Sequence, residues 1–179
     1  MLVVALYVRD AARLGAAGDP ALPPLDPPVP EGHEPMSAGR PGALRTQWAA
    51  WWQDLLAGTL PGSECVPPDY TGLAAWPDLR LSLARHFDAA RSYAQARKEE
   101  HIQLMVGSGR GAVETNLVRD LERRLRRRAS GFDLRVDELP VVGVAGWRIG
   151  HDHVLITRGL LADAAAYREW LAPVVVGLL

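Results

Sequence analysis

The sequence of 179 residues is poor in cysteine and lysine, and it contains no long uninterrupted apolar run. Cys65 is the one cysteine, which excludes an intrachain disulfide and a zinc site built from several thiolates. Stability must therefore come from packing. A chain that relies on no disulfide suits a reducing compartment, so we expect a cytoplasmic protein.

Apolar segments in this sequence are too short to cross a bilayer, which takes roughly twenty consecutive apolar residues. The N-terminal run from Leu2 to Val8 lacks the basic start and the length of a secretion signal, and Pro173 and Gly177 interrupt the apolar C-terminus. We therefore expect a soluble chain with no membrane partner. The length and the apolar content of 48% predict a single domain over residues 1–179.

Net charge is also small, at −1, so the chain has no global field that would attract nucleic acid or an anionic surface. Lys98 is the one lysine among 20 cationic residues, and an arginine bias of this kind is typical of genome composition as much as of function. Any binding of phosphate would need a local patch of arginines.

The first half of the chain combines one apolar run, a proline-rich stretch and helical periodicity. The continuous β-prone run from Leu2 to Val8 predicts a buried strand. Dense prolines predict an extended, polyproline-like segment at 19–41. Apolar residues spaced by three and four predict a buried helix between Pro41 and Gly58, and a further helical stripe begins at Asp78, which is a suitable N-cap.

In the second half, a helix from about Ala112 to Gly131 is predicted to form a helical hairpin with the preceding helix. From Phe132 onward, alternating and β-rich segments predict a β-meander, with a hairpin turn at 150–152. Asp163 should cap a last helix that Pro173 kinks or ends. The predicted fold class is α+β, with a small, mainly antiparallel sheet packed against the hairpin and two further amphipathic helices.

One glycine-rich motif, at 107–112, formally matches the alanine-ended dinucleotide-binding pattern. The residues before it fit a helix better than the strand that this pattern requires, and antiparallel hairpins follow it where a Rossmann unit needs parallel strands. We interpret it as a link between two helices, and we predict no cofactor.

Few residues are candidates for chemistry. His151 and His153, with His101 and Glu99 or Glu100, form the one set that could ligate a metal, but Gly150, His151 and Asp152 are better explained by a polar turn. The Cys65 thiol has no histidine nearby in the sequence, so we interpret it as a small packed residue. We therefore predict no catalytic and no metal-ligating residue.

Two groups of residues are candidates for binding a partner. Trp51 and Trp52 are interpreted first as core residues, but either would mark a protein interface if it were exposed beside the proline-rich segment. Arginines crowd the end of the helix before Gly131, and they can contact phosphate or an acidic partner; we single out Arg123, Arg124, Arg127 and Arg128.

The sequence thus favours a non-catalytic protein-protein interaction or assembly protein that binds another protein or itself. Two alternatives stay open. One is a metal-dependent hydrolase that uses the histidine cluster, and the other is a nucleic-acid-binding protein that uses the arginine-rich helix end. The absence of aromatic residues among these arginines counts against nucleic acid.

Overall fold

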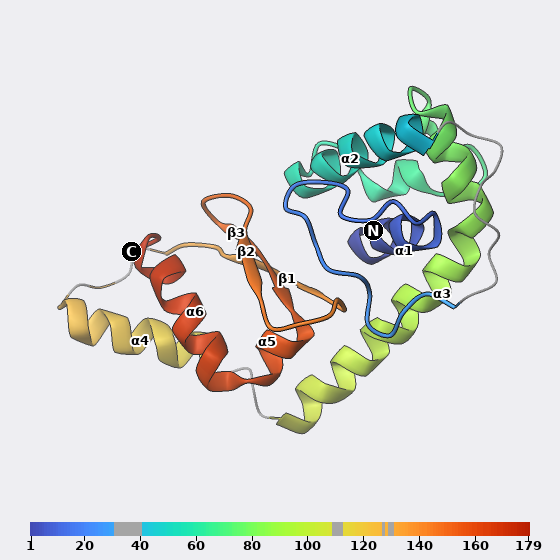
Figure 1. Ribbon diagram of the computed structural model, residues 1–179. Coiled ribbons are helices and arrows are strands. Elements are labelled where there is room, and N and C mark those ends of the chain that lie inside the picture. The colour runs from blue at the N-terminus through green and yellow to red at the C-terminus, as the bar shows by residue number, and fades with distance from the viewer. Residues whose placement is uncertain (31–40, 109–112, 127, 129–130) are drawn as a thin grey trace. The chain divides into compact units, whose positions relative to one another are not determined.

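The computed structural model describes residues 1–30, 41–108, 113–126, 128 and 131–179. Contacts within the chain divide it into two compact units, Met1–Arg97 and Lys98–Leu179. Helices and a small three-stranded sheet confirm the predicted α+β class (Figure 1). The single domain stays a prediction. In chain order the elements are α1 (Leu2–Ala11), α2 (Pro41–Ala57), η1 (Gly62–Cys65), η2 (Thr71–Leu73), α3 (Pro77–Ser108), α4 (Val113–Leu125), β1 (Arg135–Leu139), β2 (Gly146–Arg148), β3 (His153–Thr157), α5 (Arg158–Ala162) and α6 (Ala164–Val176).

The N-terminal apolar run is a helix, α1, and the predicted strand is wrong. Other parts of the first unit surround this helix, so Leu6 and Val8 are fully buried and Tyr7 nearly so. The Trp48 indole N–H of α2 donates to the Ala5 carbonyl at 2.8 Å, and the rings of Tyr7 and Tyr93 lie 5.5 Å apart. A helix enclosed on all sides is apolar all round, so its sequence shows no helical period and resembles a buried strand.

Residues 12–30 contain turns and bends and contact α1. The proline-rich extended segment at 19–41 stays a prediction. The buried Arg9 guanidinium donates to the carbonyls of Leu22 and Pro23 at 2.9 and 2.7 Å. Asp10 accepts from the Leu25 N–H at 2.7 Å and also pairs with Arg9. Prolines remove backbone donors from this segment, so side chains of α1 provide the hydrogen bonds that attach it. Residues 31–40 lie outside the described residues.

The predicted buried helix is α2, and its tryptophans are core residues. Trp48, Trp51 and Trp52 are completely buried, and the rings of Trp48 and Trp52 stack 5.5 Å apart. Gly18, in the segment 12–30, lies against this pair. A Cβ atom added there would come within 2.9 Å of the Trp48 ring and 3.0 Å of the Trp52 ring.

Helix α3 begins at Pro77, one residue before the predicted cap. Proline is common at the first helical position because its missing N–H needs no partner there. Asp78 therefore lies in the first turn, where its carboxylate accepts from the Gln47 amide at 3.1 Å. The same Gln47 side chain accepts from the Leu79 N–H at 3.0 Å and so satisfies one free donor of the helix start.

The sheet of the second unit has the strand order β1-β3-β2. Strand β2 is antiparallel to β3, and the Ile149 and Gly150 N–H groups donate to the His153 carbonyl, which confirms the turn at 150–152. Strand β1 is parallel to β3, from Arg135 opposite His153 to Leu139 opposite Thr157. The sheet is therefore mixed, and the predicted meander is wrong at β1, because β2 lies on the far side of β3.

Helix α4 packs against α6 in the described part of the chain, where the sequence suggested a hairpin with the preceding helix. The Asp163 side chain caps α6 by accepting from Ala165 and Ala166, as predicted. Helix α6 continues to Val176, past Pro173. Both helices bury apolar residues in one core with β3, made by Leu117, Leu121, Val154, Ile156, Leu160, Tyr167, Leu171, Val174 and Val175. None of the described helices has the length and apolar character that spanning a membrane requires.

Candidate functional site

The three candidate metal-ligating histidines lie in three different places. The His153 Nε2 atom is 2.8 Å from the Asp137 carboxylate, and His101 pairs with Glu138. His151 is exposed in the turn between β2 and β3. Within the described ranges, no group of three or more His, Cys, Asp and Glu side chains is close enough to hold a metal ion.

Neighbouring carboxylates on β1 explain why His101 and His153 are separated. Asp137 and Glu138 are consecutive strand residues, so their side chains point to opposite faces of the sheet. Each histidine therefore has its own carboxylate partner. Arg135 also pairs with Asp137, at 2.8 Å. Asp137 thus contacts Arg135 and His153 on one face of the sheet, while Glu138 contacts His101 on the other.

Arg158 connects Glu138, the partner of His101, to Glu100 of α3. Its guanidinium donates to Glu138 at 2.8 Å and to Glu100 at 2.7 Å. Partial burial alone would lower the pKa of Arg158, but the hydrogen bonds to the two carboxylates outweigh burial and raise it. Arg158 is therefore a permanent cation that holds β1, α5 and residue 100 together.

Trp51, Trp52 and Cys65 face the interior of the first unit. Both tryptophans and the cysteine are completely buried, so none of them presents a surface to a partner in this structure. Burial raises the pKa of the Cys65 thiol, and the neighbouring Trp51 indole opposes that shift only in part. Cys65 is thus a packed residue with little thiolate character.

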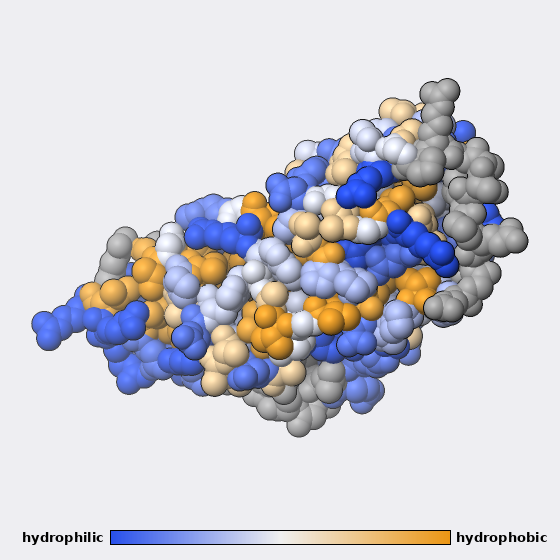
Figure 2. Space-filling view, viewed as in Figure 1, coloured by the Kyte–Doolittle hydropathy of each residue, from blue (hydrophilic) through white to orange (hydrophobic). Residues whose placement is uncertain are grey.

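The candidate arginines at the end of α4 have different surroundings. Arg123 is largely exposed and pairs with Asp120 one turn earlier. Arg124 is exposed and lines a cavity, and Arg128 is exposed beyond the helix end. Arg127 lies outside the described residues. In Figure 2 the end of α4, at the left of the view, is strongly hydrophilic with hydrophobic patches beside it.

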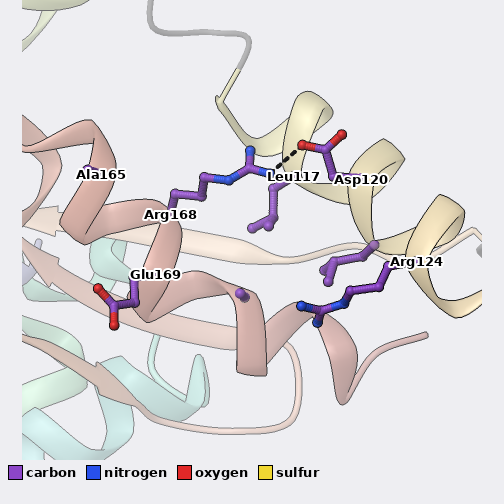
Figure 3. Close-up of a pocket in the computed structure, with 8 residues that line it drawn as sticks. Leu117, Asp120, Arg124, Ala165, Arg168 and Glu169 are labelled. Atoms are coloured by element: carbon purple, nitrogen blue, oxygen red, sulfur yellow. Dashed lines mark hydrogen bonds and ion pairs between the residues drawn. The ribbon is translucent and has the colours of Figure 1, made fainter.

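The cavity beside Arg124 is a groove between α4 and α6, with a volume of about 460 Å³ (Figure 3). Each helix contributes four side chains at positions i, i+3, i+4 and i+7, which is one helical face. The wall from α4 is Leu117, Asp120, Leu121 and Arg124, and the wall from α6 is Ala165, Arg168, Glu169 and Ala172. Ligand cavities in proteins typically measure roughly 300–1,000 Å³, so the groove is large enough to hold several side chains of a partner.

Apolar residues form the floor of this α4–α6 groove, and charged residues form its rim. Leu117 and Leu121 are 2% and 3% exposed and belong to the core beneath. Ala165 and Ala172 add little side-chain bulk, so a partner can approach the backbone of α6 closely. Leu117 and Leu121 are thus almost completely covered already, and the two alanines provide the accessible apolar surface of the groove.

Two polar contacts attach α4 to α6. The buried Tyr167 hydroxyl donates to the Glu114 carboxylate at 3.0 Å. Burial, reinforced by the nearby Glu114 charge, raises the pKa of Tyr167, so this hydroxyl stays a donor. Arg168 pairs with Asp120 across the groove, as the dashed line in Figure 3 shows. The walls are thus held at fixed positions without an occupant.

Electrostatics differ between the two halves of the rim. A hydrogen bond from Arg168, helped by the charge of Arg123, holds the pKa of Asp120 below its ordinary value. Two arginines therefore neutralise this one carboxylate. Arg124 has no hydrogen-bond or ion-pair partner among the described residues, and neither has Glu169, which points away from α4 in Figure 3. The cation on the α4 wall is thus free to bind a ligand group.

A second cavity of about 460 Å³ lies in the first unit, between the start of α1, a loop and α3. Apolar residues again dominate its lining, which consists of Met1, Val4, Val66, Pro67, Phe87, Asp88 and Arg91. None of the residues singled out from the sequence lines it. Its lining carries one carboxylate and one arginine, whereas that of the α4–α6 groove carries two of each.

The sequence pointed to Arg124 but missed the opposite wall of the groove. Ala165, Arg168, Glu169 and Ala172 lie on the face of α6 away from its apolar stripe. Their spacing repeats that of the α4 residues. Nothing in a sequence reveals, however, that two such faces meet.

Fold and site together define an α+β protein whose second unit carries a preformed two-helix groove with a basic end. No known protein family, curated protein or solved structure matches the chain.

Proposed function

We propose that this chain is a non-catalytic protein-protein interaction protein, and that the α4–α6 groove is its partner-binding surface. The observation that supports this most is the groove itself, in which the small residues Ala165 and Ala172 lie opposite Arg124, an exposed arginine without a partner among the described residues. Interface centres combine apolar contact with a small number of charged groups, and arginine is among the residues enriched there.

The separation of His101 from His153 counts against the metal-dependent hydrolase alternative. Each histidine has its own carboxylate, and His151 faces solvent beside Arg148. The nucleic-acid alternative still has the exposed arginines, but no aromatic side chain lies among them to stack on a base. An apolar groove floor has no role in binding a phosphate backbone.

A photo-crosslinking amino acid placed at position 172 of the full chain tests the proposal. The matched control carries it at position 84, where Ala84 is exposed on α3. In the chain's own host cells, position 172 should give a discrete cross-link to one polypeptide, either another protein or a second copy. Position 84 should give none.

Arg124→Glu in the same cross-linking chain should reduce the product, because the cation beside the groove is then reversed in sign. Arg85→Glu reverses an exposed arginine on α3 and should leave it unchanged. Equal patterns from positions 172 and 84, or no cross-link from either, would count against the proposal.

A further inference from the structure

We propose that the open edge of β1 pairs, antiparallel, with β1 of a second copy of this chain. The proposal concerns a different surface from the α4–α6 groove and does not depend on it. Three observations carry it: the unpaired backbone groups on this edge, a pattern of charge that is complementary to itself, and a strand-like segment before β1 that lacks a strand partner.

Strand β1 is an edge of the three-stranded sheet, with β3 on one side and no strand of the described chain on the other. The Arg135 N–H donates to the Asp152 carbonyl at 2.8 Å. Backbone groups of successive strand residues point alternately to the two sides, so those of Arg135 and Asp137 face β3. Those of Val136 and Glu138 face the open edge, where they have no hydrogen-bond partner among the described residues. Such an edge is a template for another strand.

Charge selects one way of pairing β1 with its copy. Open-edge residues must lie opposite each other, and Leu139 is buried, so the available registers are centred on residue 135, 136, 137 or 138. Centres at 135, 137 and 138 place two identical charged side chains directly opposite each other, which destabilises a strand pair. The centre at Val136 places Val136 opposite itself and Arg135 opposite Asp137.

This Val136-centred register also completes an ion-pair arrangement that one copy begins. Arg135 has a side chain that is 52% exposed, and it pairs with Asp137 of its own strand at 2.8 Å. Opposite residues of two strands lie on the same face of a sheet. The two arginines and two aspartates of the paired copies therefore alternate in sign, both along each strand and across the pair.

Residues 132–134, just before β1, have the pattern of a strand but no strand beside them. Phe132 and Leu134 alternate with Asp133, which is the period of a strand with one buried face. Strand β3 begins at His153, opposite Arg135, and therefore does not reach them. In the Val136-centred register, residues 138 and 139 of the second copy lie opposite 134 and 133. The second copy thus extends the sheet along this segment, as in recognition by strand addition.

Sedimentation equilibrium of the full chain, at concentrations up to about 0.5 mM, tests the proposal over the range that a small interface requires. The chain should dimerise. Arg135→Asp places like charges opposite each other at two positions and should weaken the dimer at least about fivefold. Arg85→Asp, which reverses an exposed arginine on α3, should have no effect. A mixture of Arg135→Asp and Asp137→Arg chains should associate again, because each reversed side chain then faces an opposite charge across the strands.

A proline substitution and amide exchange locate the contact. Val136→Pro removes an N–H that points to the open edge and keeps the hydrogen bonds to β3, so it should abolish the dimer. Val142→Pro, in the exposed loop after β1, should not. The Val136 amide should resist hydrogen exchange only at high protein concentration, and the Asp137 amide at every concentration. Unchanged circular dichroism and urea midpoints show that each variant is folded.

A chain that stays monomeric at about 0.5 mM would overturn the inference. So would a dimer that Val136→Pro leaves unchanged, or a mixture of the two folded reversal variants that fails to associate. A dimer that Arg124→Glu abolishes while Val136→Pro does not would place the contact in the α4–α6 groove instead. The cross-link from position 172 is a separate measurement, so the proposed function stands or fails independently of these results.

Discussion

Replacement of Gly18 by alanine tests the packing of the segment 12–30 against the tryptophan pair of α2. Gly18 has a φ of +92°, which L-residues rarely adopt, and its added Cβ would meet the Trp48 and Trp52 rings at 2.9 and 3.0 Å. Gly15 is the matched control. Its φ is +64°, but nothing lies within 4 Å of a Cβ atom there.

The two substitutions share a backbone cost and differ in packing. A non-glycine residue with positive φ costs about 1–2 kcal/mol, and an overpacked core costs about 1–3 kcal/mol more. Neither ring can move easily, because Trp48 and Trp52 are completely buried and stacked. We expect Gly15→Ala to lower the free energy of unfolding by about 1 kcal/mol and Gly18→Ala by about 3 kcal/mol.

Urea unfolding followed by tryptophan fluorescence measures this difference. Four of the six tryptophans precede residue 98, so the signal reports mainly on the first unit. With an m-value of about 2 kcal/mol/M, the midpoint of Gly18→Ala should lie about 1 M below that of Gly15→Ala. Equal midpoints for the two variants would refute the contact between Gly18 and the two tryptophan rings.

Three further predictions concern single groups. Tyr167→Phe removes the hydrogen bond to the Glu114 carboxylate and should lower the free energy of unfolding by about 2 kcal/mol; an unchanged urea midpoint would contradict this contact. Because Arg168 lowers the pKa of Asp120, the ionised carboxylate stabilises the fold above about pH 4, and this contribution disappears as the pH falls through the lowered value. Asp120→Asn should therefore show a weaker decline of its urea midpoint below about pH 4 than the unsubstituted chain, and parallel declines would argue against the shift. Burial of Cys65 and the raised pKa of its thiol predict that a thiol reagent modifies the native chain far more slowly than the chain in urea, and rapid native labelling would show that the thiol is accessible.

Local patterns in the sequence predicted those parts of the fold that depend on local physics. The spacing of Trp48, Trp51 and Trp52 indicated the buried face of α2, and Asp163 was recognised as the cap of α6. The prediction of a hairpin turn at 150–152 is also confirmed. Each of these features is determined by residues within one or two turns of each other.

Features that depend on distant partners were not predictable in this way. The run from Leu2 to Val8 is apolar because the helix it forms is enclosed on all sides and exposes no face to solvent. The periodicity of apolar residues cannot distinguish such a helix from a buried strand. The parallel pairing of β1 with β3 depends on which strands lie next to each other in the sheet. The alternation of apolar and polar residues after Phe132 is the same in a parallel and in an antiparallel strand.

Of the candidate site, only the α4 wall could be predicted in part, because its meeting with α6 depends on residues distant in the sequence. Arg124 stood out because arginines cluster on α4, but its surroundings depend on α6. Ala165 and Ala172 give no chemical signal in the sequence, and they matter only because their face meets Leu117 and Leu121. His101 and His153 lie apart because they pair with Glu138 and Asp137, whose side chains point to opposite faces of the sheet. No sequence motif indicates this pairing.

Methyl NMR of the full chain, titrated with the polypeptide that cross-links to position 172, tests most directly whether the α4–α6 groove is the binding surface. The methyl signals of Ala165 and Ala172, assigned by substitution, should shift on binding. Those of Leu6 and Leu25, buried in the first unit, should not change. Saturable binding with shifts confined to the first unit, or a spectrum that the polypeptide leaves unchanged, would contradict the account.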